Sequence, residues 1–133
     1  MLHVKLQFLD REIAQRRMIA NYYREHISHE KIIVPLVEHR DHHVWHLFVI
    51  RCEYRNELQS YLSQNGIQTL IHYPIPPHKQ AAYKEWNTYT YPISEKIHNE
   101  VLSLPISAYQ SLEDTHTIVQ ILNAFHPNCK DEQ

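Results

Sequence analysis

Glycine is the scarcest residue in this chain of 133 residues, where it occurs once, at Gly66. Sites that hold a phosphate group usually use glycine-rich turns, because the backbone must approach the ligand closely. This sequence contains no such turn. Long apolar runs are also missing, so no segment is predicted to cross a membrane, and the charged N-terminus is unlike a signal peptide.

Cysteine and net charge are low as well. The formal net charge is -2, so no basic excess favours nucleic acid. The chain has only two cysteines, Cys52 and Cys129, which fits a reducing compartment, and neither lies in a CxxC. We therefore expect a cytoplasmic protein that binds neither nucleic acid nor membrane. The length and the 43% hydrophobic content predict one domain over residues 1–127 and a polar tail over residues 128–133.

Histidine is the residue in excess, with 12 copies. Residues two apart on a strand share a face, so His42 and His46 would point one way and His43 the other, with His39 in the preceding turn. Zinc needs three or four ligands converging at about 2 Å. No cysteine or glutamate spacing completes such a set, so we expect no metal site.

The apolar pattern predicts an α+β fold. Residues 3–27 are predicted to form one helix, because apolar residues recur there at helical spacing. Its length is about twice the average, as for a helix that links two domains, and residues 28–127 would form the small domain. Strands are predicted over residues 31–37, 44–51, 67–71 and 102–105, and further helices over residues 54–65, 92–101 and 111–125.

These elements make a small, mostly antiparallel sheet with helices on one face, plus the long N-terminal helix. Pro35 and Pro105 place their strands at the edges of the sheet, because proline cannot donate to a ladder. Gly66 is a natural end for the second helix. Ser111 and Asp114 form a capping box that opens the last helix.

The stretch Ile-His-Tyr-Pro-Ile-Pro-Pro-His-Lys, residues 71–79, is the main candidate site. Its prolines fix φ and push the preceding residues toward extended conformations, which predicts a stiff loop. Polar side chains on a stiff loop can bind a ligand, and here they are His72, Tyr73, His78 and Lys79. The alternative is a proline-rich connector whose polar residues are incidental.

Two further sites have weaker support. A nucleophile could be Cys52, whose thiol pKa a neighbouring Arg51 could lower, or Ser103 beside a histidine. The aromatic residues could be a stacking surface or a small satellite core under the loop, and they are Tyr83, Trp86, Tyr89 and Tyr91.

Several segments in order resemble a known family. Val44–Arg51, His72-Tyr73-Pro74 and Leu102-Ser-Leu-Pro105-Ile106 resemble the C-terminal part of the DegT/DnrJ/StrS family, the PLP-dependent aminotransferases of nucleotide-linked keto sugars. The resemblance covers about residues 3–125. The text from Ile75 to Asn87 resembles one branch, the 3-transaminases that make dTDP-3-amino-3,6-dideoxyhexoses for surface polysaccharides such as lipopolysaccharide.

The resemblance implies the small domain of the fold-type I PLP transferase fold, in a C-terminal fragment of such an aminotransferase. His72 and Tyr73 would line the sugar-nucleotide pocket near a dimer interface, and His78 and Lys79 would lie at its nucleotide end. The family's Schiff-base lysine and phosphate cradle belong to a preceding large domain, so no PLP residue is carried over. We therefore expect this chain to bind no PLP and to be inactive alone.

The alternative is a non-catalytic dimerising or ligand-binding module derived from the family. In either case the apolar face of the long helix needs cover. That need predicts a homodimer or a larger assembly.

Overall fold

A computed structural model describes residues 2–127, and they form an α+β fold as predicted. The 3₁₀ helices are labelled η. In chain order the elements are α1 (Leu2–Leu6), α2 (Leu9–His26), β1 (Ile32–Ile33), η1 (Arg40–His42), β2 (Phe48–Cys52), α3 (Arg55–Gln64), η2 (Pro77–Lys79), η3 (Ala81–Trp86), α4 (Pro92–Glu100), β3 (Val101–Leu104) and α5 (Leu112–Asn123). The predicted polar tail and Cys129 lie outside the described residues, and the domain boundaries stay a prediction.

The predicted single N-terminal helix is two helices, and this correction concerns its first turns. The chain turns at Gln7 and Phe8, where Phe8 N–H donates to Lys5 O at 3.1 Å. Two apolar side chains of α1 face solvent, since Val4 is 58% and Leu6 62% exposed. Most of the stability of a helix in a protein comes from packing of its apolar face, so an exposed first segment gains little stability from continuing the helix without a break.

The sheet is antiparallel, with strand order β1-β2-β3. β1 and β3 are the outer strands of that order, as Pro35 and Pro105 predicted. β2 begins at Phe48 rather than at Val44, because Trp45 has a φ of 53°, which no strand contains. The predicted strand at residues 67–71 is wrong: it is reduced to one bridge, between Leu70 and Ser103.

The core lies where β2 meets α2. The Tyr23 and Trp45 rings lie 5.0 Å and 5.4 Å from the Phe48 ring, and each such buried aromatic contributes roughly 1.5–3 kcal/mol. Tyr23 also donates its hydroxyl proton to Pro105 O at 2.9 Å. Asn123 of α5 binds the end of α2, since its Nδ2 donates to His26 O at 2.9 Å.

Both predicted helix-end signals are present. Gly66 has a φ of 78°, and Ile67 N–H donates to Leu62 O at 2.9 Å, which closes the end of α3. At α5, Asp114 N–H donates to Ser111 Oγ at 2.9 Å. The Asp114 carboxylate, however, accepts the Ser111 hydroxyl proton at 2.6 Å instead of binding a free backbone amide.

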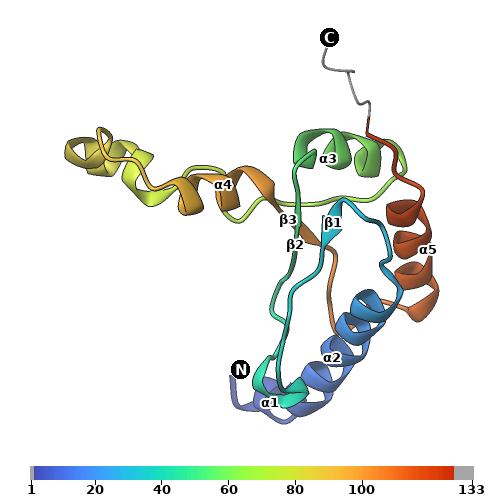
Figure 1. The fold of residues 1–133 in the computed structure, drawn as a ribbon. Helices are drawn as coiled ribbons and strands as arrows, with labels where there is room; N and C mark the ends of the chain where they lie inside the picture. Colours follow the sequence, from blue (N-terminus) through green and yellow to red (C-terminus); the bar gives the residue numbers. More distant parts are fainter. Residues whose placement is uncertain (1, 128–133) are drawn as a thin grey trace.

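Residues 74–91 form a projection that we call the arm. Figure 1 shows the arm and α4 extending to the left of the sheet, whereas α2 and α5 lie together on its right. The expected clustering of helices on one face therefore holds for α2 and α5. Among residues 2–127, no helix is both long enough and apolar enough to span a membrane.

Candidate functional site

The predicted site loop leaves the sheet beside β3. Ser103 N–H donates to Leu70 O at 2.8 Å, and Leu70 N–H donates to Ser103 O at 3.3 Å. The chain then enters the proline segment, where Pro76 has φ -64° and ψ 149°, the extended conformation that was expected. The loop therefore starts from a hydrogen-bonded anchor on the sheet.

His72 and Tyr73 lie just beyond this anchor, joined by a cis peptide bond. His72 Nδ1 lies 2.9 Å from Ser103 Oγ. The two rings meet edge to face, with centroids 5.7 Å apart and planes at 87°. His72 is half-buried and Tyr73 is 68% exposed. An imidazole held at one nitrogen and an exposed phenol can both hydrogen-bond to the oxygens of a ligand.

His78 lies at the base of the arm and is only 5% exposed. Its Nε2 lies 2.8 Å from Glu95 Oε1 at the start of α4, and its ring meets Tyr91 edge to face at 4.8 Å. The hydrogen bond to His78, together with the Tyr91 amide, lowers the pKa of the Glu95 carboxyl. His78 thus joins η2 to α4, and its expected role in nucleotide binding stays a prediction.

Lys79 makes a second link within the arm. Its Nζ donates to Asn87 O at 2.9 Å and to Tyr89 O at 3.0 Å, and it lies 3.9 Å from Glu95 Oε1. An ammonium group has three donors, so most of its capacity is used inside the chain. A role for Lys79 at the nucleotide end likewise stays a prediction.

The aromatic residues of the arm do not form a satellite core. The Tyr83 and Trp86 rings stack at 4.9 Å with planes at 10°. All four aromatic side chains remain between 40% and 55% exposed. Asn87 fixes the backbone beside the Tyr83–Trp86 stack, because its Nδ2 donates to Tyr83 O at 3.0 Å and to His78 O at 2.9 Å. Of the two alternatives left open by the sequence, the exposed surface is the one present.

The nucleophile alternative loses its support at Cys52. The thiol is 1% exposed, and burial raises its pKa, whereas a reactive thiol needs a lowered one. Arg51 does not oppose this effect, because its Nη2 binds Glu100 Oε2 at 2.7 Å.

The histidines near β2 have separate surroundings. His43 Nδ1 accepts the Trp45 amide proton at 2.9 Å, and the His39 and His42 rings lie 4.7 Å apart. Within residues 2–127, no three His, Cys, Asp or Glu side chains gather as potential metal ligands. We therefore propose no metal at this position.

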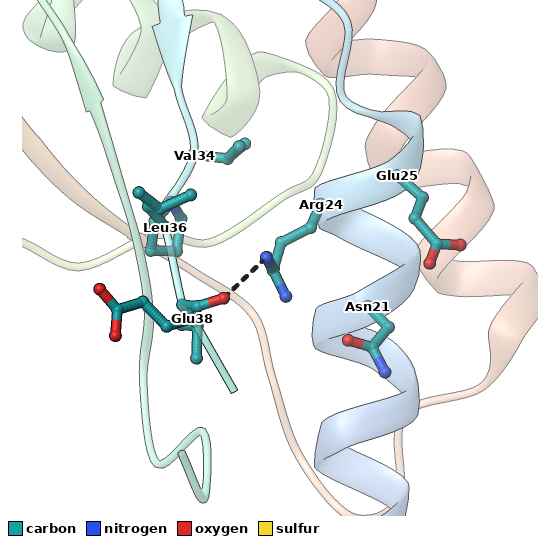
Figure 2. Close-up of a pocket in the computed structure, with 8 residues that line it drawn as sticks. Asn21, Arg24, Glu25, Val34, Leu36 and Glu38 are labelled. Carbon is teal, nitrogen blue, oxygen red and sulfur yellow. Dashed lines mark hydrogen bonds between the residues drawn. The ribbon is translucent and has the colours of Figure 1, made fainter. Parts of the chain in front are cut away.

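A hollow of about 370 Å³ lies between α2 and the segment after β1 (Figure 2). Arg24 Nη2 donates to Val37 O at 3.5 Å across it, and Glu25 and Glu38 also line it. None of the four predicted site residues lines this hollow. We assign this hollow no ligand, because the Arg24 guanidinium already donates to the Val37 carbonyl on its other side.

Comparison with known proteins decides the family. Residues 1–123 match the DegT/DnrJ/EryC1/StrS aminotransferase family. The chain belongs to this family. It is 52% identical over 124 residues to the dTDP-3-amino-3,6-dideoxy-alpha-D-galactopyranose transaminase of Aneurinibacillus thermoaerophilus, and the match covers 93% of this chain and 34% of that protein. This relative belongs to the branch that the loop sequence resembles.

Solved structures of the DegT family have the same fold. S. venezuelae DesV, in complex with a ketimine intermediate, is 31% identical with a TM-score of 0.83, over 92% of this chain and 34% of DesV. NtdA from Bacillus subtilis, with bound cofactor PMP, is 28% identical with a TM-score of 0.75, over 84% of this chain and 27% of NtdA. This chain therefore spans between 27% and 34% of the length of these relatives.

Aminotransferases of the DegT family are PLP-dependent, so the described residues can be tested for a PLP site. All five described lysines are exposed, and Lys79 is bound to backbone carbonyls. The one glycine ends α3 and forms no phosphate cradle. Residues 2–127 therefore do not fit PLP by themselves, and no chemical step through the cofactor is derived from them.

Sequence reasoning missed the partners of the site residues. It named Ser103 only as a nucleophile, although Ser103 is the residue bound to His72. It did not name Glu95 and gave Asn87 no structural role, although both residues hold the arm. Glu95 lies one turn after Pro92 at a helix start, where a carboxylate is favoured, but its contact with His78 depends on tertiary structure.

Proposed function

We propose that this chain is the sugar-nucleotide-facing C-terminal part of a PLP-dependent aminotransferase that acts on a dTDP-linked keto sugar. In this proposal His72 and Tyr73 hydrogen-bond to oxygens of the sugar nucleotide. The observation that carries the proposal is the held imidazole of His72 beside the exposed Tyr73 phenol. The name of the 52% identical relative supports the substrate class.

The proposal assigns the reaction to the making of 3-amino-3,6-dideoxy sugars for surface polysaccharides, in the cytoplasm and with glutamate as amino donor. PLP would supply the amino-group transfer chemistry. His78 and Lys79 are weaker candidates for the nucleotide end, because their polar atoms already have partners within the chain. The expected homodimer belongs to the same proposal.

The test is a chimera in which this chain replaces the matching segment of the Aneurinibacillus relative. We expect the chimera to transaminate a dTDP-3-dehydro sugar with glutamate. His72→Ala in the chimera should lower kcat/KM by about tenfold or more, through loss of a positioned hydrogen bond. The matched control is His46→Ala, because His46 is exposed and its ring has no hydrogen bond within residues 2–127.

Two outcomes would count against the proposal. One is a folded chimera that binds PLP and leaves the keto sugar unchanged. The other is equal activity of the His72→Ala and His46→Ala chimeras. The chain by itself, mixed with PLP, glutamate and the keto sugar, should form no product, because none of its described lysines lies in a PLP site.

A further inference from the structure

Ser103 occupies a fixed position in the middle of β3. It pairs with Val49 of β2 on one side and with Leu70 on the other, through backbone hydrogen bonds of 2.8 Å and 3.3 Å. Backbone pairing on both sides fixes the position of the Ser103 Cβ, so only the χ1 rotamer and the hydroxyl rotation of the side chain can vary. The side chain is almost fully enclosed, with the residue 5% exposed.

The hydroxyl of Ser103 has one hydrogen-bond partner within residues 2–127, and this is His72 Nδ1 at 2.9 Å. A neutral imidazole has one N–H and one bare nitrogen. If Nδ1 carried the proton, the enclosed Ser103 hydroxyl would accept from it and would have no acceptor for its own proton. An enclosed donor without an acceptor is unfavourable.

We propose that Ser103 is a positioning residue. Its hydroxyl donates a hydrogen bond to His72 Nδ1, and this keeps the proton of the neutral imidazole on Nε2. Nε2 has no hydrogen-bond partner within the described residues. His72 is therefore set as a hydrogen-bond donor toward an acceptor oxygen, and not as a base. The Tyr73 ring, edge to face with the imidazole at 5.7 Å, flanks the same group.

A nucleophile–base pair would need the same two residues in a different setting. An attacking hydroxyl must be open to its substrate and its base needs an orienting partner. Ser103 is enclosed in the sheet, and no carboxylate of residues 2–127 binds the His72 ring. The contact therefore orients the imidazole and does not activate the serine.

The consequence for ligand binding rests on the proposed function. A sugar nucleotide offers diphosphate, carbonyl and hydroxyl oxygens, all of which can accept a hydrogen bond from Nε2–H. With the ring held by Ser103, less side-chain freedom is lost when the ligand binds. The keto or diphosphate oxygen is the class of atom that this donor recognises.

The experiment reads the His72 tautomer directly, in the full chain. Long-range ¹H–¹⁵N NMR at mildly alkaline pH distinguishes protonated from bare ring nitrogens, and His72→Gln identifies the signal. We expect His72 as a single tautomer with Nε2 protonated, and His46 as an unrestrained mixture. Ser103→Ala should move His72 toward the His46 pattern, while Ser103→Thr keeps the wild-type pattern. Ser63→Ala, at an exposed serine of α3, is the control.

Protonated Nδ1 in the wild type, or an unchanged tautomer in a folded Ser103→Ala variant, would overturn the inference. In the chimera, Ser103→Ala should weaken dTDP-sugar binding by about 2- to 10-fold, and Ser103→Thr should restore it. A chimera that binds no dTDP-sugar counts against the proposed function and leaves the tautomer result standing, so the two failures are distinguishable.

Discussion

His78 Nε2 lies 2.8 Å from Glu95 Oε1, so the base of the arm is joined to the first turn of α4. The same carboxylate oxygen accepts the Tyr91 amide proton at 3.1 Å. Glu95 therefore connects the two segments at the base of the arm, one at His78 and the other at Tyr91. The hydrogen bond to His78 is the largest of the effects that lower the pKa of its carboxyl.

This relationship predicts that acid loosens the arm. A carboxyl with a lowered folded-state pKa stabilises fully above its ordinary value of 4.5, and the contribution is lost as the pH falls through the folded-state pKa. Denaturant unfolding across a pH series should therefore show wild type more stable than Glu95→Gln above pH 4.5, with the difference shrinking on acidification. Glu85→Gln, on the exposed part of the arm, is the control. A constant difference across the series would contradict the prediction.

Lys79 should stabilise the arm locally. Its ammonium binds Asn87 O and Tyr89 O at 2.9 Å and 3.0 Å, and a net gain of about 1 kcal/mol corresponds to roughly fivefold in local opening. Lys79→Met should therefore speed hydrogen exchange in residues 83–91 by about fivefold. Lys84→Met, at an exposed lysine of η3, should leave exchange near wild type. Equal rates in both variants would show that the Lys79 contacts do not hold the arm.

The sequence predicted best where the signal is local. Gly66 and Ser111 end and begin their helices through contacts within a few residues, and both helices were placed within about two residues. The outer positions of β1 and β3 in the strand order agree with the missing amide of proline, although Leu70 adds one bridge to β3. These features depend on backbone chemistry that neighbouring residues specify.

The failures concern features that only tertiary structure decides. The apolar spacing through Leu6 and Leu9 is helical, but these side chains stay 62% and 44% exposed, and α1 separates from α2. Trp45 adopts a left-handed backbone conformation, which tryptophan does not predict because glycine and asparagine are the usual residues there. In the site, the loop and its polar residues were visible in the sequence, whereas the contact of His72 with Ser103 joins residues 31 positions apart.

Thr69 contains an unsatisfied polar atom. Its Oγ1 is buried and has no hydrogen-bond partner within residues 2–127. An unpaired buried hydroxyl costs about 1–3 kcal/mol, and a methyl group of the same shape removes that cost. Thr69→Val should therefore raise the free energy of unfolding by about 1 kcal/mol, measured in denaturant, whereas Thr88→Val at an exposed position should change little. A loss of stability in Thr69→Val would mean that the hydroxyl has a partner after all.

Tyr23 should make the core sensitive to alkali. Burial raises its pKa from 10.0 to about 12, so its contribution is full below pH 10 and is lost as the pH rises toward 12. Tyr23→Phe removes the hydroxyl that binds Pro105 O and Gln110 Nε2. We expect it to lower stability by about 1–2 kcal/mol at neutral pH and to flatten the alkaline loss. Tyr109→Phe, at a 90% exposed ring, is the control, and an equally steep alkaline loss in Tyr23→Phe would argue against this assignment.

The expected homodimer is tested at the N-terminal helices. An apolar hollow of about 730 Å³ lies there, lined by α1, the first turns of α2 and Ala108–Tyr109, and Leu6 and Phe8 contribute exposed apolar side chains to it. If a second copy covers this surface, each buried side chain contributes about 1.5–3 kcal/mol. The Leu6→Glu/Phe8→Glu variant should then raise the dimer dissociation constant by about 100-fold or more.

Sedimentation over a range of concentrations measures this change. Leu36→Glu is the matched control, because Leu36 is an equally apolar residue, 90% exposed, that does not line the hollow. Wild type and the control should sediment as dimers under conditions where the double variant is a monomer. A wild-type chain that stays monomeric at every concentration would contradict the predicted self-association, because no second copy would then cover the hollow at α1.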